Sequence, residues 1–95
     1  MKRDRQLIER FWALRRSVRF SSTETVLYLA LVRLCRDAGW PPALLCPNAA
    51  LCREAGIDES TLVRARHALI RKGVIGYAGT TAVSYTHLTL PTILR

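Results

Sequence analysis

Six hydroxyl, imidazole and cationic side chains lie close together between residues 60 and 72: Ser60, Thr61, Arg64, His67, Arg71 and Lys72. Apolar residues recur in the same stretch at i, i+3 and i+7, the spacing of one buried helix face: Leu62, Ala65 and Leu69. On a helix of 3.6 residues per turn, Ser60, Arg64, His67 and Arg71 fall on the opposite face. Guanidinium groups bond base edges, and hydroxyl and ammonium groups suit phosphate oxygens. The pattern therefore favours a helix that recognises a nucleic-acid duplex.

Arg64 is the first candidate for reading a base, because a bidentate pair with guanine discriminates against the wrong base by about 1–3 kcal/mol. Ser60 and Thr61 stand near the helix start, where they reach bases or phosphates. For His67 the alternatives are a DNA contact and a solvated side chain. For Arg71 and Lys72 they are phosphate contact and a favourable interaction with the helix dipole. Arg66 falls at the edge of the apolar face, where its stem covers the core.

Two short helices joined by a tight turn would position these side chains. Asn48 is expected to cap a first helix that runs to about Glu54, Gly56 to give the turn its backbone freedom, and Ile57 to plug the space between the helices. Asp58 is expected to cap the second helix and Gly73 to end it. An extended segment follows at residues 74–77, with Ala78, Gly79 and Thr80 as the tip of a wing.

Upstream residues predict two more helices and a strand. Residues 4–16 form an amphipathic helix, and Ser21 to Glu24 have the capping-box spacing before a helix that is apolar almost all round. Asp37, Ala38 and Gly39 close that helix, and residues 43–46 are long enough for a strand that pairs with the wing. The expected fold is mostly α with a small β-wing, a winged helix-turn-helix with an extra N-terminal helix, in one domain over residues 1–81.

The chain is basic, with a formal net charge of +8 over 95 residues, which favours an anionic partner. Basic residues are densest in the first nineteen positions, against two acidic ones: Lys2, Arg3, Arg5, Arg10, Arg15, Arg16 and Arg19. Any one of them can be an ordinary solvated side chain. Together with the helix pair they indicate double-stranded DNA as partner, and Lys2, Arg3 and Arg5 are candidate phosphate contacts.

Several classes of protein are not expected. Charge returns at Glu9 and Arg10 before a secretory apolar region forms, and the longest apolar run is too short for a membrane span, so a cytoplasmic location is expected. Cys35, Cys46 and Cys52 match no zinc spacing and are interpreted as reduced core thiols, with no metal. No cysteine–histidine pair, phosphate-cradling glycine loop or carboxylate cluster is present, so neither an enzyme nor a cofactor is predicted.

Five segments together resemble the winged N-terminal domain of DnaD-like replication initiators, a group that includes phage replisome organisers. They are Leu27 to Leu31, Gly39-Trp40-Pro41, Gly56-Ile57-Asp58, Thr61 to Ile70 and Gly73 to Tyr77. The resemblance implies DNA binding or self-association for this domain, contacts with replication-machinery proteins, and a separate C-terminal domain that this sequence lacks. Initiation of replication of a phage or plasmid-like element is thus implied by the resemblance alone.

The C-terminal residues have a different resemblance. Ten consecutive residues, Val83 to Thr92, match one reading frame of the mosaic-end adapter used in transposase-based sequencing libraries, GTC TCT TAT ACA CAT CTG ACG CTG CCG ACG. We therefore interpret residues 82–95 as a non-native tail from a truncated metagenomic sequence, with the natural C-terminal region missing. The alternative is an ordinary wing strand, since valine, threonine and tyrosine suit strands whatever their source.

Two other functions stay open. A transcriptional regulator would use the same DNA-binding domain, because nothing in residues 59–71 distinguishes an origin from an operator. An oligomerisation or partner-docking module would use the wing and the first helix to bind protein, including a second copy of the chain.

Overall fold

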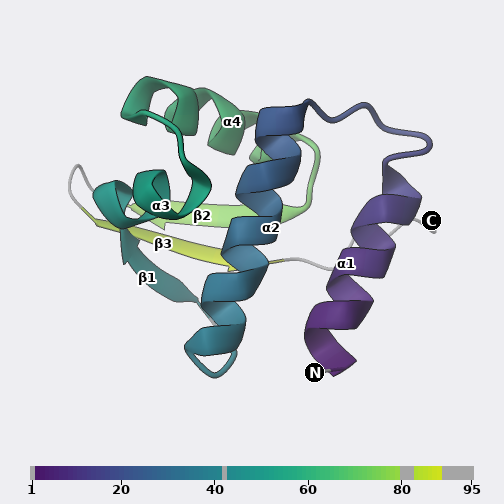
Figure 1. Cartoon of the computed structure of the whole chain (residues 1–95), viewed down its shortest axis with the longest axis horizontal. Coiled ribbons are helices and arrows are strands. Elements are labelled where there is room, and N and C mark those ends of the chain that lie inside the picture. The colour runs from purple at the N-terminus through teal and green to yellow at the C-terminus, as the bar shows by residue number, and fades with distance from the viewer. Residues whose placement is uncertain (1, 42, 80–82, 89–95) are drawn as a thin grey trace.

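The computed structural model describes residues 2–41, 43–79 and 83–88 and is mostly helical, with one small sheet (Figure 1). The elements in chain order are α1 (Lys2–Leu14), α2 (Ser22–Asp37), β1 (Leu44–Pro47), α3 (Asn48–Ala55), α4 (Glu59–Arg71), β2 (Ile75–Gly79) and β3 (Val83–Leu88). The expectation of a mainly helical chain with few strands is confirmed.

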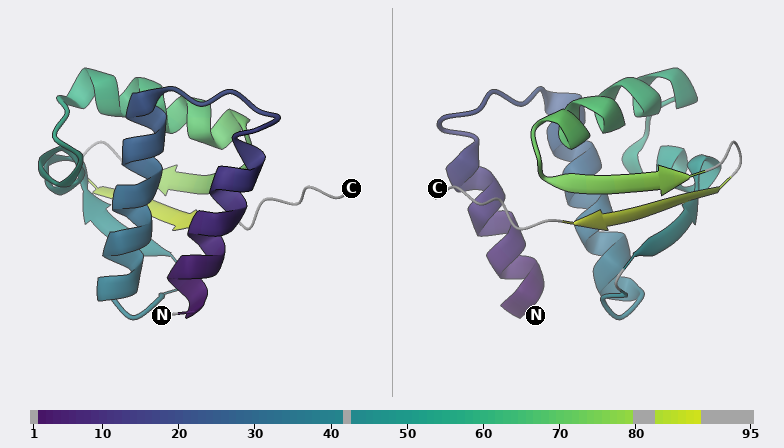
Figure 2. Two further views of the ribbon diagram at one scale, coloured as in Figure 1. Left: turned by 45° about the vertical axis from the view of Figure 1, so that its right-hand side comes forward. Right: turned by 180° about the vertical axis from the view of Figure 1, so that it is seen from behind.

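The sheet has three antiparallel strands in the order β1-β3-β2. Ile75 of β2 faces Leu88 of β3, and Leu44 of β1 faces Thr86, so β3 lies between the other two (Figure 2). The predicted wing tip is wrong in part, because Ala78 and Gly79 belong to β2 and pair with Tyr85 and Ser84 of β3. Thr80 lies outside the described residues. The central strand comes from the segment that resembles adapter sequence.

Helix α2 lies at the centre of the core, because its own apolar residues point to most sides of the helix. Leu27, Tyr28, Leu31 and Val32 are at most 2% exposed and contact elements on several faces. α1 lies beside α2 (Figure 2) and contributes Leu7 and Phe11 to the core. The Phe11 ring stacks on Tyr28 of α2 with centroids 4.3 Å apart and planes 7° apart. α3, α4 and the sheet close the other sides of the same core.

Helix ends follow local hydrogen bonding. The capping box of α2 is confirmed: Ser21 Oγ accepts from the Glu24 N–H at 3.1 Å, and Glu24 Oε1 accepts from the Ser21 N–H at 3.1 Å. α2 ends at Asp37 as expected, and Gly39 has φ +82.

Three predicted boundaries were wrong by one or two residues. α1 spans residues 2–14 and not 4–16, because Arg16 and Ser17 bond carbonyls only three residues back and tighten the chain into turns. β1 spans 44–47 and not 43–46, because Pro47 still pairs in register with Val83. β2 begins at Ile75 and not at residue 74, because its ladder starts where Ile75 faces Leu88.

No helix in the described part of the chain combines the length and apolar character needed to cross a membrane.

Candidate nucleic-acid interface

Helix α4 is fixed at both ends by caps that the sequence predicts. Asp58 Oδ1 accepts from the Thr61 N–H at 2.8 Å and from the Ser60 hydroxyl at 3.2 Å. These hydrogen bonds, from Thr61 first, hold the pKa of the Asp58 carboxyl below its usual 3.8, and the nearby Arg64 charge adds to them. At the other end the Lys72 N–H bonds the Ala68 carbonyl, and Gly73 turns the chain with φ +78.

The turn between α3 and α4 depends on Gly56, which has φ +71. Its N–H donates to the Cys52 carbonyl at 2.8 Å, and the Ile57 N–H donates to the same carbonyl at 3.1 Å. A side chain at residue 56 would have space, so backbone conformation and not crowding favours glycine here. Ile57 is half-buried against the core, as a plug between the helices requires.

Asn48 does not cap α3, which corrects the prediction. Pro47 occupies the cap position, and it makes no side-chain capping hydrogen bond. Instead, Asn48 Oδ1 accepts from Arg66 Nη1 at 3.1 Å, and Asn48 Nδ2 donates to Glu59 Oε2 at 3.2 Å. Because one amide bonds two α4 residues, it fixes the start of α3 against α4. Arg66 itself is only 5% exposed and is therefore buried more deeply than its position at the edge of the face suggested.

The outer face of α4 carries most of the predicted DNA-contacting residues. Ser60, Arg64, His67 and Arg71 are exposed, whereas Leu62, Ala65 and Leu69 are at most 5% exposed, so the predicted division into faces is confirmed. The half-buried Thr61 lines a groove of about 330 Å³ against the start of α2, together with Arg64 and Arg71. Neither arginine forms an ion pair with any residue that the structure describes.

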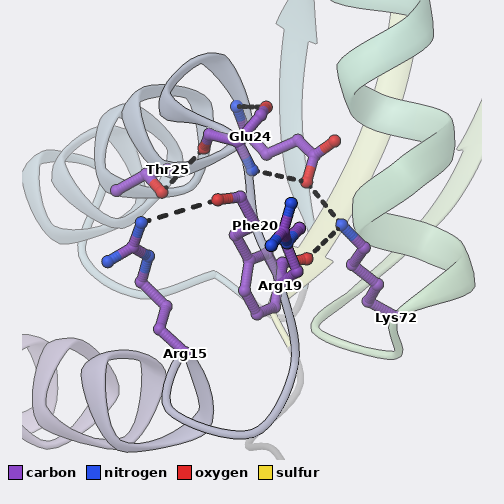
Figure 3. A network of polar contacts seen from close by, with 7 residues as sticks. Arg15, Arg19, Phe20, Glu24, Thr25 and Lys72 are labelled. Atoms are coloured by element: carbon purple, nitrogen blue, oxygen red, sulfur yellow. Dashed lines mark hydrogen bonds and ion pairs between the residues drawn. The ribbon is translucent and has the colours of Figure 1, made fainter.

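The Lys72 side chain points towards the interior more than towards the exposed face of α4. Its ammonium is 2.6 Å from Glu24 Oε1, donates to the Arg19 carbonyl at 2.6 Å, and lies 4.8 Å from the centre of the Phe20 ring (Figure 3). Burial raises the pKa of Glu24, but hydrogen bonds from Lys72 and Ser21 outweigh it and hold that pKa below 4.5. Lys72 thus joins α4 to α2 and is the least available of the six candidates to a phosphate.

The candidate phosphate contacts at the start of the chain lie far from α4. The Arg3 guanidinium lies 5.2 Å from the Trp40 ring, Arg5 pairs with Glu9 at 3.2 Å, and Asp4 pairs with Arg36 at 3.4 Å. Arg36 is near the end of α2, about 18 Å of helix from Glu24 at 1.5 Å per residue. The structure therefore does not bring Arg3 and Arg5 to the face of α4 (Figure 1). The Lys2 side chain is outside the described part of the chain.

The segment that is bonded to the end of α4 carries two arginines that the sequence does not distinguish from the other basic residues of the first nineteen positions. Arg16 and Arg19 belong to the connector, residues 15–21 between α1 and α2, and both are exposed. The Lys72 bond to the Arg19 carbonyl ties this connector to the end of α4. One signal was available: both arginines come just before the Ser21 capping box, which places them at the start of α2.

The thiols lie in the core and carry no sign of a reactive site. Cys35 and Cys46 are buried, and Cys52 is half-buried. Burial raises the pKa of each above 9.0, which favours the neutral thiol over the nucleophilic thiolate. Among the described residues, no group of three His, Cys, Asp or Glu side chains is arranged to hold a metal ion.

Comparison of the chain with protein-family models, with curated proteins and with solved structures found no match.

Proposed function

We propose that this chain binds double-stranded DNA by inserting the exposed face of α4 into the major groove, as a winged helix-turn-helix does. The observation that carries the proposal is the outer face of α4, on which Arg64, His67 and Arg71 are exposed above a buried apolar face. A helix of this width fits the major groove, about 12 Å across, and its arginines suit guanine and phosphate.

The surrounding elements support a winged helix-turn-helix. α3 and α4 are joined by the short turn around Gly56, and the antiparallel pair β2 and β3 follows α4 in the place of a wing. β1, between α2 and α3, completes the sheet. In such motifs the second helix of the pair enters the groove while the first crosses the backbone.

Origin recognition during replication of a mobile element is the more specific proposal, and it rests on the resemblance of about residues 11–79 to DnaD-like initiators. The described contacts of α4 fit an operator equally well, so a transcriptional regulator stays the alternative within the same DNA-binding function. The docking-module alternative is less favoured, because exposed unpaired arginines are costly to bury against protein.

The test compares Arg64→Ala with wild type on a duplex selected from a random pool and on a random duplex at the same salt concentration. We expect a loss of about 1–3 kcal/mol on the selected duplex and a smaller loss on the random one, because a base contact carries sequence information and a phosphate contact does not. Arg33→Ala is the matched control: Arg33 is exposed on α2, pairs with Glu54 and carries the same charge.

If Arg64→Ala lost the same binding free energy on both duplexes, Arg64 would not be a residue that contacts a base. Failure of the wild-type chain to bind any duplex at low salt would contradict the DNA-binding proposal and revive the docking module.

A further inference from the structure

We propose that the connector holds one phosphate strand of the bound duplex through Arg16 and Arg19. This inference rests on the DNA-binding function proposed for α4. The contacts with the DNA phosphate backbone then come from the connector and not from the start of α1.

The exposed arginines differ in whether they have an ion-pair partner. At the end of the molecule that contains the start of α1 and the end of α2, two arginines pair with carboxylates: Arg5 with Glu9 at 3.2 Å, and Arg36 with Asp4 at 3.4 Å and Asp37 at 3.5 Å. At the end that contains α4, four exposed arginines form no ion pair within the described residues: Arg16, Arg19, Arg64 and Arg71. These four cations attract a polyanion to the surface beside α4.

The carboxylates at this end are already engaged. Glu24 accepts from Lys72 and from the Ser21 N–H. Asp58 accepts from Thr61 and Ser60 as the cap of α4. Glu59, in the first turn of α4, accepts from Asn48 Nδ2. Because the Lys72 ammonium pairs with Glu24, this carboxylate repels an incoming phosphate less.

Three depressions that share lining residues lie between the two pairs of arginines. A depression of about 390 Å³ is lined by Arg16 and Arg19, and a second of about 720 Å³ extends from Arg19 to Ser21 and Glu24. The groove of about 330 Å³ at Arg64 and Arg71 begins at the same two residues, Ser21 and Glu24. A single sugar-phosphate strand that leaves the face of α4 can therefore follow this surface to the connector.

The connector is also held in place relative to α4. Lys72 donates to the Arg19 carbonyl, and its ammonium lies over the Phe20 ring, so the backbone of the connector is anchored while the Arg19 side chain stays exposed (Figure 3). Arg15 Nη2 donates to the Phe20 carbonyl at 3.5 Å, and its guanidinium lies 4.8 Å from the Trp12 ring, which adds a second anchor. Anchoring lowers the entropy lost when phosphate binds.

The experiment measures the salt dependence of binding to a labelled random duplex for the full chain and for two double variants of equal charge, R16Q/R19Q and R3Q/R5Q. Each phosphate contact contributes about 0.9 to the slope of log Kobs against log salt. We therefore expect R16Q/R19Q to make the negative slope shallower by about 2. R3Q/R5Q should leave the slope nearly unchanged. R16K/R19K should keep the wild-type slope, because lysine retains the charge.

Equal changes of slope in the two double variants would overturn the inference, since net charge and not position would then govern binding. An unchanged slope in R16Q/R19Q would also overturn it, while wild-type binding would leave the proposed function of α4 intact. Absence of binding by the wild-type chain itself would defeat both proposals. Circular dichroism melts establish that both double variants fold.

Discussion

At the scale of single residues, Tyr28 combines a favourable ring with an unfavourable hydroxyl. Its ring is fully buried and stacks on Phe11, whereas its hydroxyl has no hydrogen-bond partner among the described residues. Burial raises the pKa of Tyr28 to about 12. A buried polar group without a partner costs about 1–3 kcal/mol, so packing of the ring must offset that cost.

We predict that Tyr28→Phe raises the free energy of unfolding by about 1 kcal/mol, because the ring stays and the unsatisfied hydroxyl is removed. The pKa is higher in the folded chain than the usual 10.0, so the wild type loses stability as pH rises above 10. The variant should lack this part of the loss. Urea unfolding at neutral and alkaline pH measures both effects, and a destabilised Phe variant would show that the hydroxyl has a partner.

The residues of α4 show which contacts a sequence can predict. The buried set Leu62, Ala65 and Leu69 follows from helical periodicity, and the Asp58 cap follows from local spacing. The bond between Asn48 and Arg66 joins residues eighteen apart and depends on the angle between α3 and α4. No local sequence pattern encodes that angle. Local spacing therefore suggests a cap at Asn48 and does not reveal its bond to Arg66.

At the scale of elements, the end of α4 is joined to the start of α2 by Lys72. Its two hydrogen bonds and its ring contact with Phe20 come from one side chain that is about one-quarter exposed. The sequence predicts the α2 capping box, but not that Glu24 serves both the box and Lys72. Long-range pairing of this kind appears only when the helices are packed.

We predict that Lys72→Met lowers the free energy of unfolding by about 1–3 kcal/mol at neutral pH, because it removes a charged hydrogen bond. The pKa of Glu24 is lower in the folded chain than its usual 4.5, so this stabilisation is present above pH 4.5 and is lost as pH falls through the folded pKa. Unfolding of the wild type should therefore depend more steeply on pH in that acidic range than unfolding of the variant. Parallel curves for the two proteins would contradict the role of the ion pair.

At the scale of the whole molecule, the sheet depends on its central strand. β1 and β2 pair only with β3 within the described ladders, and β3 comes from residues that resemble adapter sequence. Backbone ladders require extended residues and tolerate many side chains, so a foreign segment rich in Val, Thr and Tyr can fill this place. We propose that the natural chain has another sequence here. Sequencing the source DNA across codon 82 tests this, and recovery of the same tail would contradict it.

We predict that truncation after Thr81 destabilises the chain, because β1 and β2 lose their partner and expose unpaired edges. Replacement of residues 83–88 by six alternating Thr and Val residues should restore the stability, since it supplies extended backbone without the side chains of the present β3. Urea unfolding and size-exclusion chromatography compare the three proteins. A truncated chain as stable and monomeric as the full one would show that the central strand is dispensable.

The most direct test of the central claim is an amide chemical-shift titration of the isotope-labelled chain with a random DNA duplex at low salt. We expect the largest shifts on α4, at Arg64, His67 and Arg71, and on the connector, and no change in the first turn of α1. Absence of shifts at saturating duplex, or shifts concentrated around Arg3 and Arg5, would contradict this claim.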